Sequence, residues 1–82
     1  MYFVYILYSK TINKYYIGFT GDSIEVRLSK HLASHKGFTS KAKDWEIKRV
    51  EKFEFKLQAM TREKEIKKWK SRQKIEKLCA TE

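Results

Sequence analysis

The sequence predicts an α+β fold, a three-stranded antiparallel sheet flanked by helices in the order β-β-α-β-α-α. Two observations predict it. The N-terminal part is rich in β-forming residues, whereas most of the C-terminal part repeats its apolar residues at helical spacing. The chain has 82 residues, of which 41% are hydrophobic and 15% aromatic. We therefore expect one domain over residues 1–82 with a compact core.

The first two elements form a predicted hairpin. Residues 2–8 are apolar on both alternating faces, which is typical of a strand that is covered on both sides and central in its sheet. Residues 9–14 carry turn chemistry around Asn13, and residues 15–19 make a second short strand. We therefore expect antiparallel pairing over residues 2–19.

A helix is predicted next, over about residues 23–34. Asp22 is the expected N-cap, and Glu25, three residues later, completes a capping-box pattern. Its buried stripe has helical spacing and consists of Ile24, Leu28 and Leu32. Residues 35–44 are expected to form a loop that contains Gly37.

The rest of the chain adds one strand and two helices. Residues 45–55 read as the third strand, and a shift of the apolar positions between Ile47 and Val50 predicts a bulge or an edge position. Helical periodicity covers residues 57–70, and Ser71 is the expected cap of a last short helix.

Charge and cysteine content restrict the partners and the compartment. A net charge of +9 favours a polyanion, with nucleic acid as the first candidate and an anionic membrane surface as the second. The single cysteine, Cys79, excludes an intramolecular disulfide and a thiolate zinc cluster, which fits a reducing cytoplasm. The apolar N-terminal run is too short for a membrane span or a secretion signal. We expect a cytoplasmic protein without a membrane partner, and its oligomeric state stays open.

Glu63 is the strongest chemical signal in the residues themselves. It falls between Ala59 and Ile66 on the apolar side of the predicted helix, whereas Glu65 points about 160° away, among lysines. A carboxylate on a core-facing side is costly unless it is paired or binds a cation. Two interpretations stay open for Glu63, a metal ligand and a buried salt bridge to a nearby Lys or Arg. Glu65 is expected to be a solvated surface charge.

Arg27 and His31 are helical neighbours at i and i+4, at the rim of the buried stripe. The forked donors of arginine suit a phosphoryl group, and the near-neutral pKa of histidine suits proton transfer. Such a pair is also common on ordinary surfaces, so both interpretations stay open.

Two tyrosines and a glycine accompany this pair. Tyr5 and Tyr16 lie on adjacent predicted strands, so that their hydroxyls can converge, although tyrosines in strands are usually packing residues. Gly18 either allows a close approach of backbone and substrate or fills a position without room for a Cβ atom.

Lysines supply the remaining candidate contacts to a substrate. They are Lys36, Lys41 and Lys43 in the predicted loop and Lys67 on the predicted helix. Such residues bind phosphates in a salt-dependent manner, although several lysines of this chain are expected to be solvated surface only.

Four short motifs occur in a specific order and spacing. They are Phe3-Val4-Tyr5, Tyr16-Ile17-Gly18, Arg27-Leu28-Ser29-Lys30-His31 and Ala59-Met60-Thr61-Arg62-Glu63. Together they resemble the GIY-YIG nuclease superfamily, above all its small free-standing bacterial members, and the chain is similar to the N-terminal nuclease domain of the bacterial excision-repair endonuclease. The first motif departs from the superfamily pattern, because Phe3 stands where a glycine is usual.

The resemblance implies a role for each candidate. Tyr5 and Tyr16 match the two motif tyrosines, and Arg27 matches the arginine of the first helix. His31 occupies a position where members carry His or Tyr. Glu63 matches the single acidic ligand of a Mg²⁺ or Mn²⁺ ion. The implied fold is again a three-stranded antiparallel sheet with flanking helices.

We therefore expect a divalent-metal-dependent endonuclease that hydrolyses phosphodiester bonds in DNA, selects DNA structure, and acts in repair or recombination. Tyr16 or Tyr5 would act on the attacking water, as base or as orienting group, with help from His31. Arg27 would stabilise the charge that develops on the phosphate. The alternative is a non-catalytic nucleic-acid-binding module that retains the nuclease fold. Metal-dependent turnover distinguishes the two.

Overall fold

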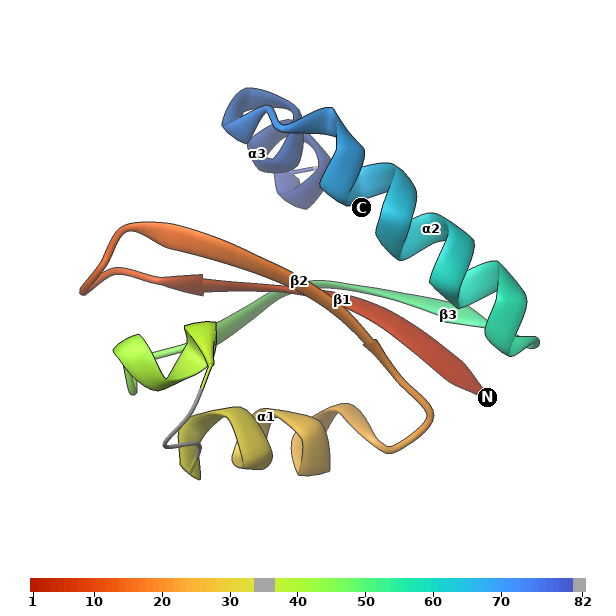
Figure 1. Ribbon diagram of the computed structural model, residues 1–82, viewed down its shortest axis with the longest axis horizontal. Coiled ribbons are helices and arrows are strands. Elements are labelled where there is room, and N and C mark those ends of the chain that lie inside the picture. Colours follow the sequence, from red (N-terminus) through yellow and green to blue (C-terminus); the bar gives the residue numbers. More distant parts are fainter. Residues whose placement is uncertain (34–36, 81–82) are drawn as a thin grey trace.

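The fold has the predicted order of elements, as a computed structural model that describes residues 1–33 and 37–80 shows (Figure 1). The strands are β1 (Tyr2–Ser9), β2 (Lys14–Thr20) and β3 (Glu46–Phe53). The helices are α1 (Ile24–Ala33), the short 3₁₀ helix η1 (Phe38–Lys41), α2 (Lys56–Trp69) and α3 (Arg72–Ala80).

The sheet has the strand order β2-β1-β3, and both pairings are antiparallel. The strand β1 is therefore central, as its apolar sequence predicts. The pairing of β1 with β3 shifts register between Ile6 and Leu7, so that Lys48 has no partner opposite it. The bulge expected in the third strand is confirmed, and β3 is also an edge strand.

Two layers of helices cover the two faces of the sheet. Helix α1 lies on one face, and α2 and α3 lie on the other (Figure 1). Alternate side chains of β1 follow this division, because successive residues of a strand point to opposite faces. Val4 and Ile6 join the core on the α2 side, whereas Tyr5 and Leu7 join the core on the α1 side. We call these sides the α2 face and the α1 face.

The local boundaries differ from the sequence expectations at a few points. The N-cap of α1 is Ser23 and not Asp22, because the Ser23 hydroxyl accepts the Val26 amide. Residue three after this cap is therefore Val26, which cannot complete a capping box, so the prediction with Glu25 was wrong. The hydroxyl of Ser71 accepts the Lys74 amide, which confirms the cap of α3.

The predicted loop and third strand also differ in extent from the observed elements. The segment expected as a loop contains η1. The third strand ends at Phe53 instead of residue 55, because Phe55 precedes α2 and donates its amide to the Gln58 side chain.

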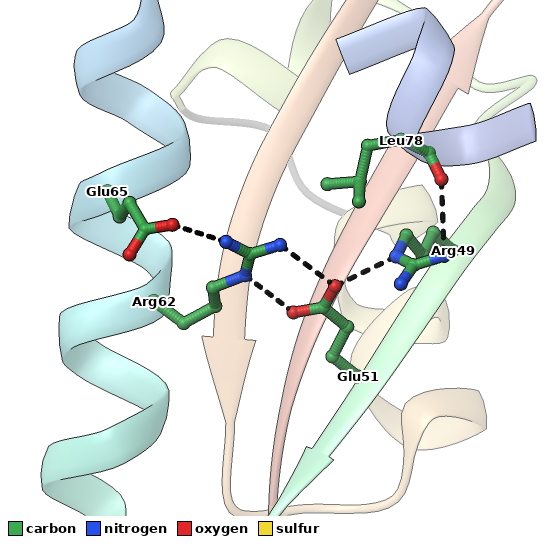
Figure 2. Close-up of polar contacts among 5 residues, drawn as sticks. All are labelled: Arg49, Glu51, Arg62, Glu65 and Leu78. Carbon is green, nitrogen blue, oxygen red and sulfur yellow. Dashed lines mark hydrogen bonds and ion pairs between the residues drawn. The ribbon is translucent and has the colours of Figure 1, made fainter. Parts of the chain in front are cut away.

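An ion-pair network joins β3 to α2 and α3 (Figure 2). The Glu51 carboxylate accepts hydrogen bonds from Arg49 Nε at 2.9 Å and from Arg62 Nε at 2.8 Å. Arg62 also pairs with the exposed Glu65, and Arg49 donates to the Leu78 carbonyl. Two arginines thus hold one carboxylate and lower the pKa of Glu51. We call these residues the Glu51 network.

Candidate active site

Tyr5 is the centre of a hydrogen-bonded cluster on the α1 face. Its side chain is 2% exposed and comes from the central strand β1. The hydroxyl accepts a hydrogen bond from Arg27 Nε at 3.1 Å and lies 2.7 Å from His31 Nε2. Both partners come from α1, which places them one helical turn apart on the side that faces the sheet.

His31 is buried, not at the rim as the helical pattern suggested. It is 6% exposed, and its Nδ1 lies 3.0 Å from the Thr39 hydroxyl. The Thr39 carbonyl in turn accepts the indole N–H of Trp45 at 2.9 Å. The cluster therefore runs Arg27–Tyr5–His31–Thr39, and we call it the Tyr5 chain.

The protonation of the Tyr5 chain follows from burial and from charge. Burial lowers the pKa of His31, and the neighbouring Arg27 lowers it further, so the imidazole is neutral at neutral pH. Burial raises the pKa of Tyr5 despite its hydrogen bond from Arg27, so the phenol keeps its proton. Because Arg27 already donates to the Tyr5 oxygen, the phenolic proton points to His31 Nε2. His31 then carries its own proton on Nδ1 and donates it to Thr39.

Gly18 provides the space for this arrangement. It pairs with Tyr5 across the sheet, and a Cβ atom at this position would lie 2.5 Å from the Tyr5 hydroxyl oxygen. The same atom would lie 3.1 Å from Cε2 of Tyr16. Gly18 is therefore required by side chains of the site itself, and the interpretation as a position without room for Cβ is correct.

Tyr16 forms a wall of an open pocket beside the Tyr5 chain. The pocket has a volume of about 240 Å³ and is also lined by Arg27, Lys30, His31 and η1 residues. The Tyr16 ring packs edge-on against His31 at 5.0 Å and stacks on Phe38 at 6.1 Å between centroids. Unlike Tyr5, Tyr16 is only half-buried, so it is the phenol that a bound molecule can reach.

Arg27 carries its charge into this pocket. Its hydrogen bond to Tyr5 raises the pKa of the guanidinium, which stays protonated. Within residues 1–33 and 37–80, no carboxylate lies at ion-pair distance from Arg27. The pocket thus presents a half-buried, uncompensated cation, which favours an anionic ligand.

Glu63 lies on α2, on the other face of the sheet from α1. Its side chain is 16% exposed, and its carboxylate lies 3.6 Å from Lys67 Nζ. Its negative charge is one of the minor causes that raise the pKa of Tyr5, so Glu63 and the Tyr5 chain interact electrostatically. Both sequence interpretations of Glu63 keep some support, because the ion pair is present but longer than a hydrogen bond.

A comparison of the sequence with protein-family models identifies the family of this chain. The model of the GIY-YIG catalytic domain matches residues 1–76. This chain belongs to the GIY-YIG family. The resemblance of the four motifs is thereby confirmed, and the family is one of nucleases, whose substrates are nucleic acids. No curated protein and no solved structure matches the chain significantly.

The lysines of this GIY-YIG domain are less concentrated than the sequence suggested. Lys36 lies outside the described residues. Lys41 is exposed, with its Nζ 5.3 Å from the centroid of the Phe38 ring, and Lys43 is exposed as well. Lys67 lies beside Glu63 on the α2 face and not at the pocket.

Residues of the segment after α1 were missed by the sequence argument. Thr39 fixes the orientation of His31, and Phe38 and Trp45 enclose the Tyr16 ring. Two large aromatic residues in an otherwise polar, lysine-containing stretch were the signal that this segment packs on the sheet. Lys30 also lines the pocket. The sequence does not distinguish it from a surface lysine, because it lies off the apolar stripe of the helix.

No helix among the described residues has the length and apolar character that crossing a bilayer requires.

Proposed function

We propose that this domain is a divalent-metal-dependent endonuclease that hydrolyses phosphodiester bonds in DNA. The observation that carries the proposal is the uncompensated Arg27 held by the Tyr5 chain beside an open pocket. A binding surface alone has no need for a buried tyrosine–histidine pair with a defined proton arrangement. Nucleic-acid cleavage requires both a cation for the phosphate and a path for a proton.

Arg27 acts on the scissile phosphate. Its Nε is held by Tyr5, which leaves the terminal nitrogens of the guanidinium for phosphate oxygens. Because the Tyr5 hydroxyl holds the Arg27 side chain in place, little reorganisation is needed when charge develops on those oxygens. Tyr5 is therefore a positioning residue.

Tyr16 and His31 have separate roles in the proposed reaction, one toward the attacking water and one toward its proton. Tyr16 lines the pocket and orients the attacking water. The neutral His31 lines the same pocket and takes up the proton that the water loses. No free phenolate forms, which removes the difficulty that a phenol of pKa about 10 is a weak base at neutral pH.

Glu63 would hold the metal ion. Among the described residues no group of three or more His, Cys, Asp or Glu side chains gathers as a closed metal site. One mostly buried carboxylate fits Mg²⁺ or Mn²⁺, because Mg²⁺ is commonly held by one or two carboxylates and by substrate phosphates. When bound, such an ion supplies positive charge to the scissile phosphate and the leaving oxygen.

We further propose that the enzyme selects distorted or branched DNA, in repair or recombination. The net charge of +9 supplies affinity for any phosphate backbone. A domain of 82 residues has little surface for reading a long base sequence, so local deformability is the more accessible signal.

The test is a cleavage assay on labelled duplex, nicked, flapped, branched and single-stranded DNA and on RNA. Each substrate is incubated with Mg²⁺, Mn²⁺ or EDTA and with the wild type, Glu63→Gln or Glu65→Gln. Glu65→Gln is the matched control, because it removes the same charge from the exposed side of the same helix. Metal-dependent cuts that disappear only in Glu63→Gln support the proposal. Binding without cutting on every substrate would favour the non-catalytic module instead.

A further inference from the structure

A second hollow lies on the α2 face, between the β1–β2 hairpin and the turn that joins α2 to α3. Its volume is about 490 Å³, larger than the pocket beside the Tyr5 chain. Its apolar floor includes Tyr15, Ile17 and Ile66, and its rim carries Lys14, Lys67, Lys70 and Arg72. We call it the basic groove.

The chemistry of the basic groove matches a polyanion with apolar parts. None of its lining residues is acidic. Arg72 is paired with Glu76, and Lys67 with Glu63. Within the described part of the chain, neither Lys14 nor Lys70 makes an ion pair, so these two exposed lysines carry the uncompensated charge of the rim.

The groove is preformed by its own residues. Arg72 donates from Nη1 to the Asn13 carbonyl at 2.9 Å and from Nη2 to the Asn13 side chain at 2.6 Å. Its guanidinium also lies 5.5 Å from the Tyr15 ring centroid, so α3 is fastened to the hairpin across the groove. A ligand that enters does not have to order either wall.

Lys70 occupies a backbone position that favours glycine. It ends α2 in the left-handed region, with φ 46° and ψ 32°. A non-glycine residue there is strained, and helices commonly use glycine at this place. In this conformation Lys70 lines the groove, next to Ser71.

The groove and the active-site pocket lie on opposite faces of the same edge strand. Tyr16 of β2 lines the pocket, whereas its neighbours Tyr15 and Ile17 line the groove. Because β2 has no strand on its outer side, a flexible chain can turn around this edge. A duplex follows so tight a turn only at a large bending cost, since the persistence length of DNA is about 150 base pairs.

We propose that the basic groove binds a single-stranded extension of the DNA substrate, whose phosphates contact Lys14 and Lys70 while a base rests on the apolar floor. Proteins that bind single strands without sequence preference combine a positive groove with aromatic and apolar contacts to the bases. That this strand continues into the active-site pocket rests on the proposed nuclease function. The binding itself does not.

The first test measures binding of a short fluorescent oligo(dT) in EDTA, by anisotropy over a salt series. The double variant Lys14→Gln/Lys70→Gln is compared with Lys74→Gln/Lys77→Gln, which removes the same charge from exposed α3 residues outside the groove. Each lost phosphate contact reduces the slope of log affinity against log salt by about 0.7. We expect a reduction of about 1.4 in the groove variant and the wild-type slope in the control. Equal slopes in the two double variants would overturn the proposal.

The second test separates the groove from the chemistry. Cleavage of flapped and nicked DNA is compared for wild type, the groove variant and the control Lys74→Gln/Lys77→Gln. We expect the groove variant to lose the preference for flapped over nicked DNA and the control to keep it. If wild type cuts nothing but the slope still falls, the nuclease proposal fails and the groove stands. If wild type cuts but the groove variant keeps the flap preference, the groove proposal fails alone.

Discussion

Arginines hold a polar network on each face of the sheet, but the two networks differ in charge balance. In the Glu51 network, Arg49 and Arg62 share one carboxylate, and Arg62 takes a second from Glu65 (Figure 2). In the Tyr5 chain, Arg27 is held by a phenol that is itself bonded to a neutral imidazole. The first network satisfies its cations internally. The second orients a cation and leaves its charge for a ligand.

The comparison shows how the same residue type serves stability in one place and chemistry in another. A guanidinium that is neutralised by carboxylates contributes to cohesion between β3, α2 and α3. A guanidinium that is held only by neutral groups keeps its attraction for phosphate. Substitutions in the Glu51 network should therefore mainly lower stability, whereas substitutions in the Tyr5 chain should mainly lower kcat.

The largest expected effect separates Arg27 from Arg62. We expect Arg27→Ala to reduce kcat on a cleaved substrate by about 10²- to 10³-fold, the usual loss for one preorganised donor to a developing charge. Arg62→Ala should retain kcat and lose about 1–3 kcal/mol of unfolding free energy, because Glu51 is left partly unpaired. Single-turnover cleavage and urea denaturation measure the two quantities. A large loss of kcat in Arg62→Ala with a stable fold would contradict the division.

Gly18→Ala tests the geometry of the Tyr5 chain. The new Cβ would lie 2.5 Å from the Tyr5 hydroxyl oxygen and 2.7 Å from Cζ, and Tyr5 is too deeply buried to withdraw. We expect about a 10²-fold loss of kcat from misplacement of Arg27 and His31, with about 1–3 kcal/mol lost in stability. Gly21→Ala is the matched control, because its Cβ would lie 3.2 Å from the Tyr2 ring, away from the site. Equal kcat values for the two variants would rule out this role of Gly18.

Thr39 offers a smaller effect within the same chain. Thr39→Val removes the acceptor for the Nδ1–H of His31 without a large change in shape, and Thr39→Ser keeps it. One neutral hydrogen bond contributes about 1 kcal/mol, so we expect kcat to fall by up to about tenfold in Thr39→Val with KM unchanged. The lost hydrogen bond stabilises the protonated His31 ring more than the neutral ring, so its loss lowers the pKa of His31. The acid limb of the pH profile should therefore move to lower pH. A merely structural role for Thr39 would leave that limb in place.

The order of elements was predictable because hydrophobic periodicity determines it. The continuous apolar run of β1 and the helical spacing of α2 are strong local signals, and the structure agrees with both. The N-cap of α1 was not predictable in the same way. Asp22 and Ser23 are both good caps, and the choice between them depends on where the chain leaves β2.

The candidate site was predictable only in part. Motif spacing brought together Tyr5, Tyr16, Gly18, Arg27 and His31, and the structure places these five residues at one site. Thr39 was not predicted as a site residue, because its contact with His31 depends on how the segment after α1 folds back on the sheet. The basic groove escaped for the same reason, since Lys14 and Lys70 meet only through the packing of α3 on the hairpin.

The smallest expected effect is a difference in the pH at which the two networks lose stability. His31 has a lowered pKa in the folded state. Below about pH 6.5 its imidazole is therefore protonated in the unfolded chain while it is still neutral in the folded chain. Unfolding free energy should therefore fall as the pH drops from 7.5 to 5.5, by about 1.4 kcal/mol for each pH unit over which only the unfolded chain is protonated.

Glu51 has a lowered pKa as well, so its stabilisation is also lost as the pH drops, but in a range about two pH units lower. Its contribution is fully present above about pH 4.3 and is lost only as the pH falls through its lower folded pKa. Urea denaturation from pH 7.5 to 5.5 should thus respond to His31→Gln, which flattens the slope, and not to Glu51→Gln, which lowers stability equally at both ends. His35→Gln, at the other histidine of the chain, is the control. A slope that survives in His31→Gln would mean that the buried imidazole of the Tyr5 chain is not the group that titrates.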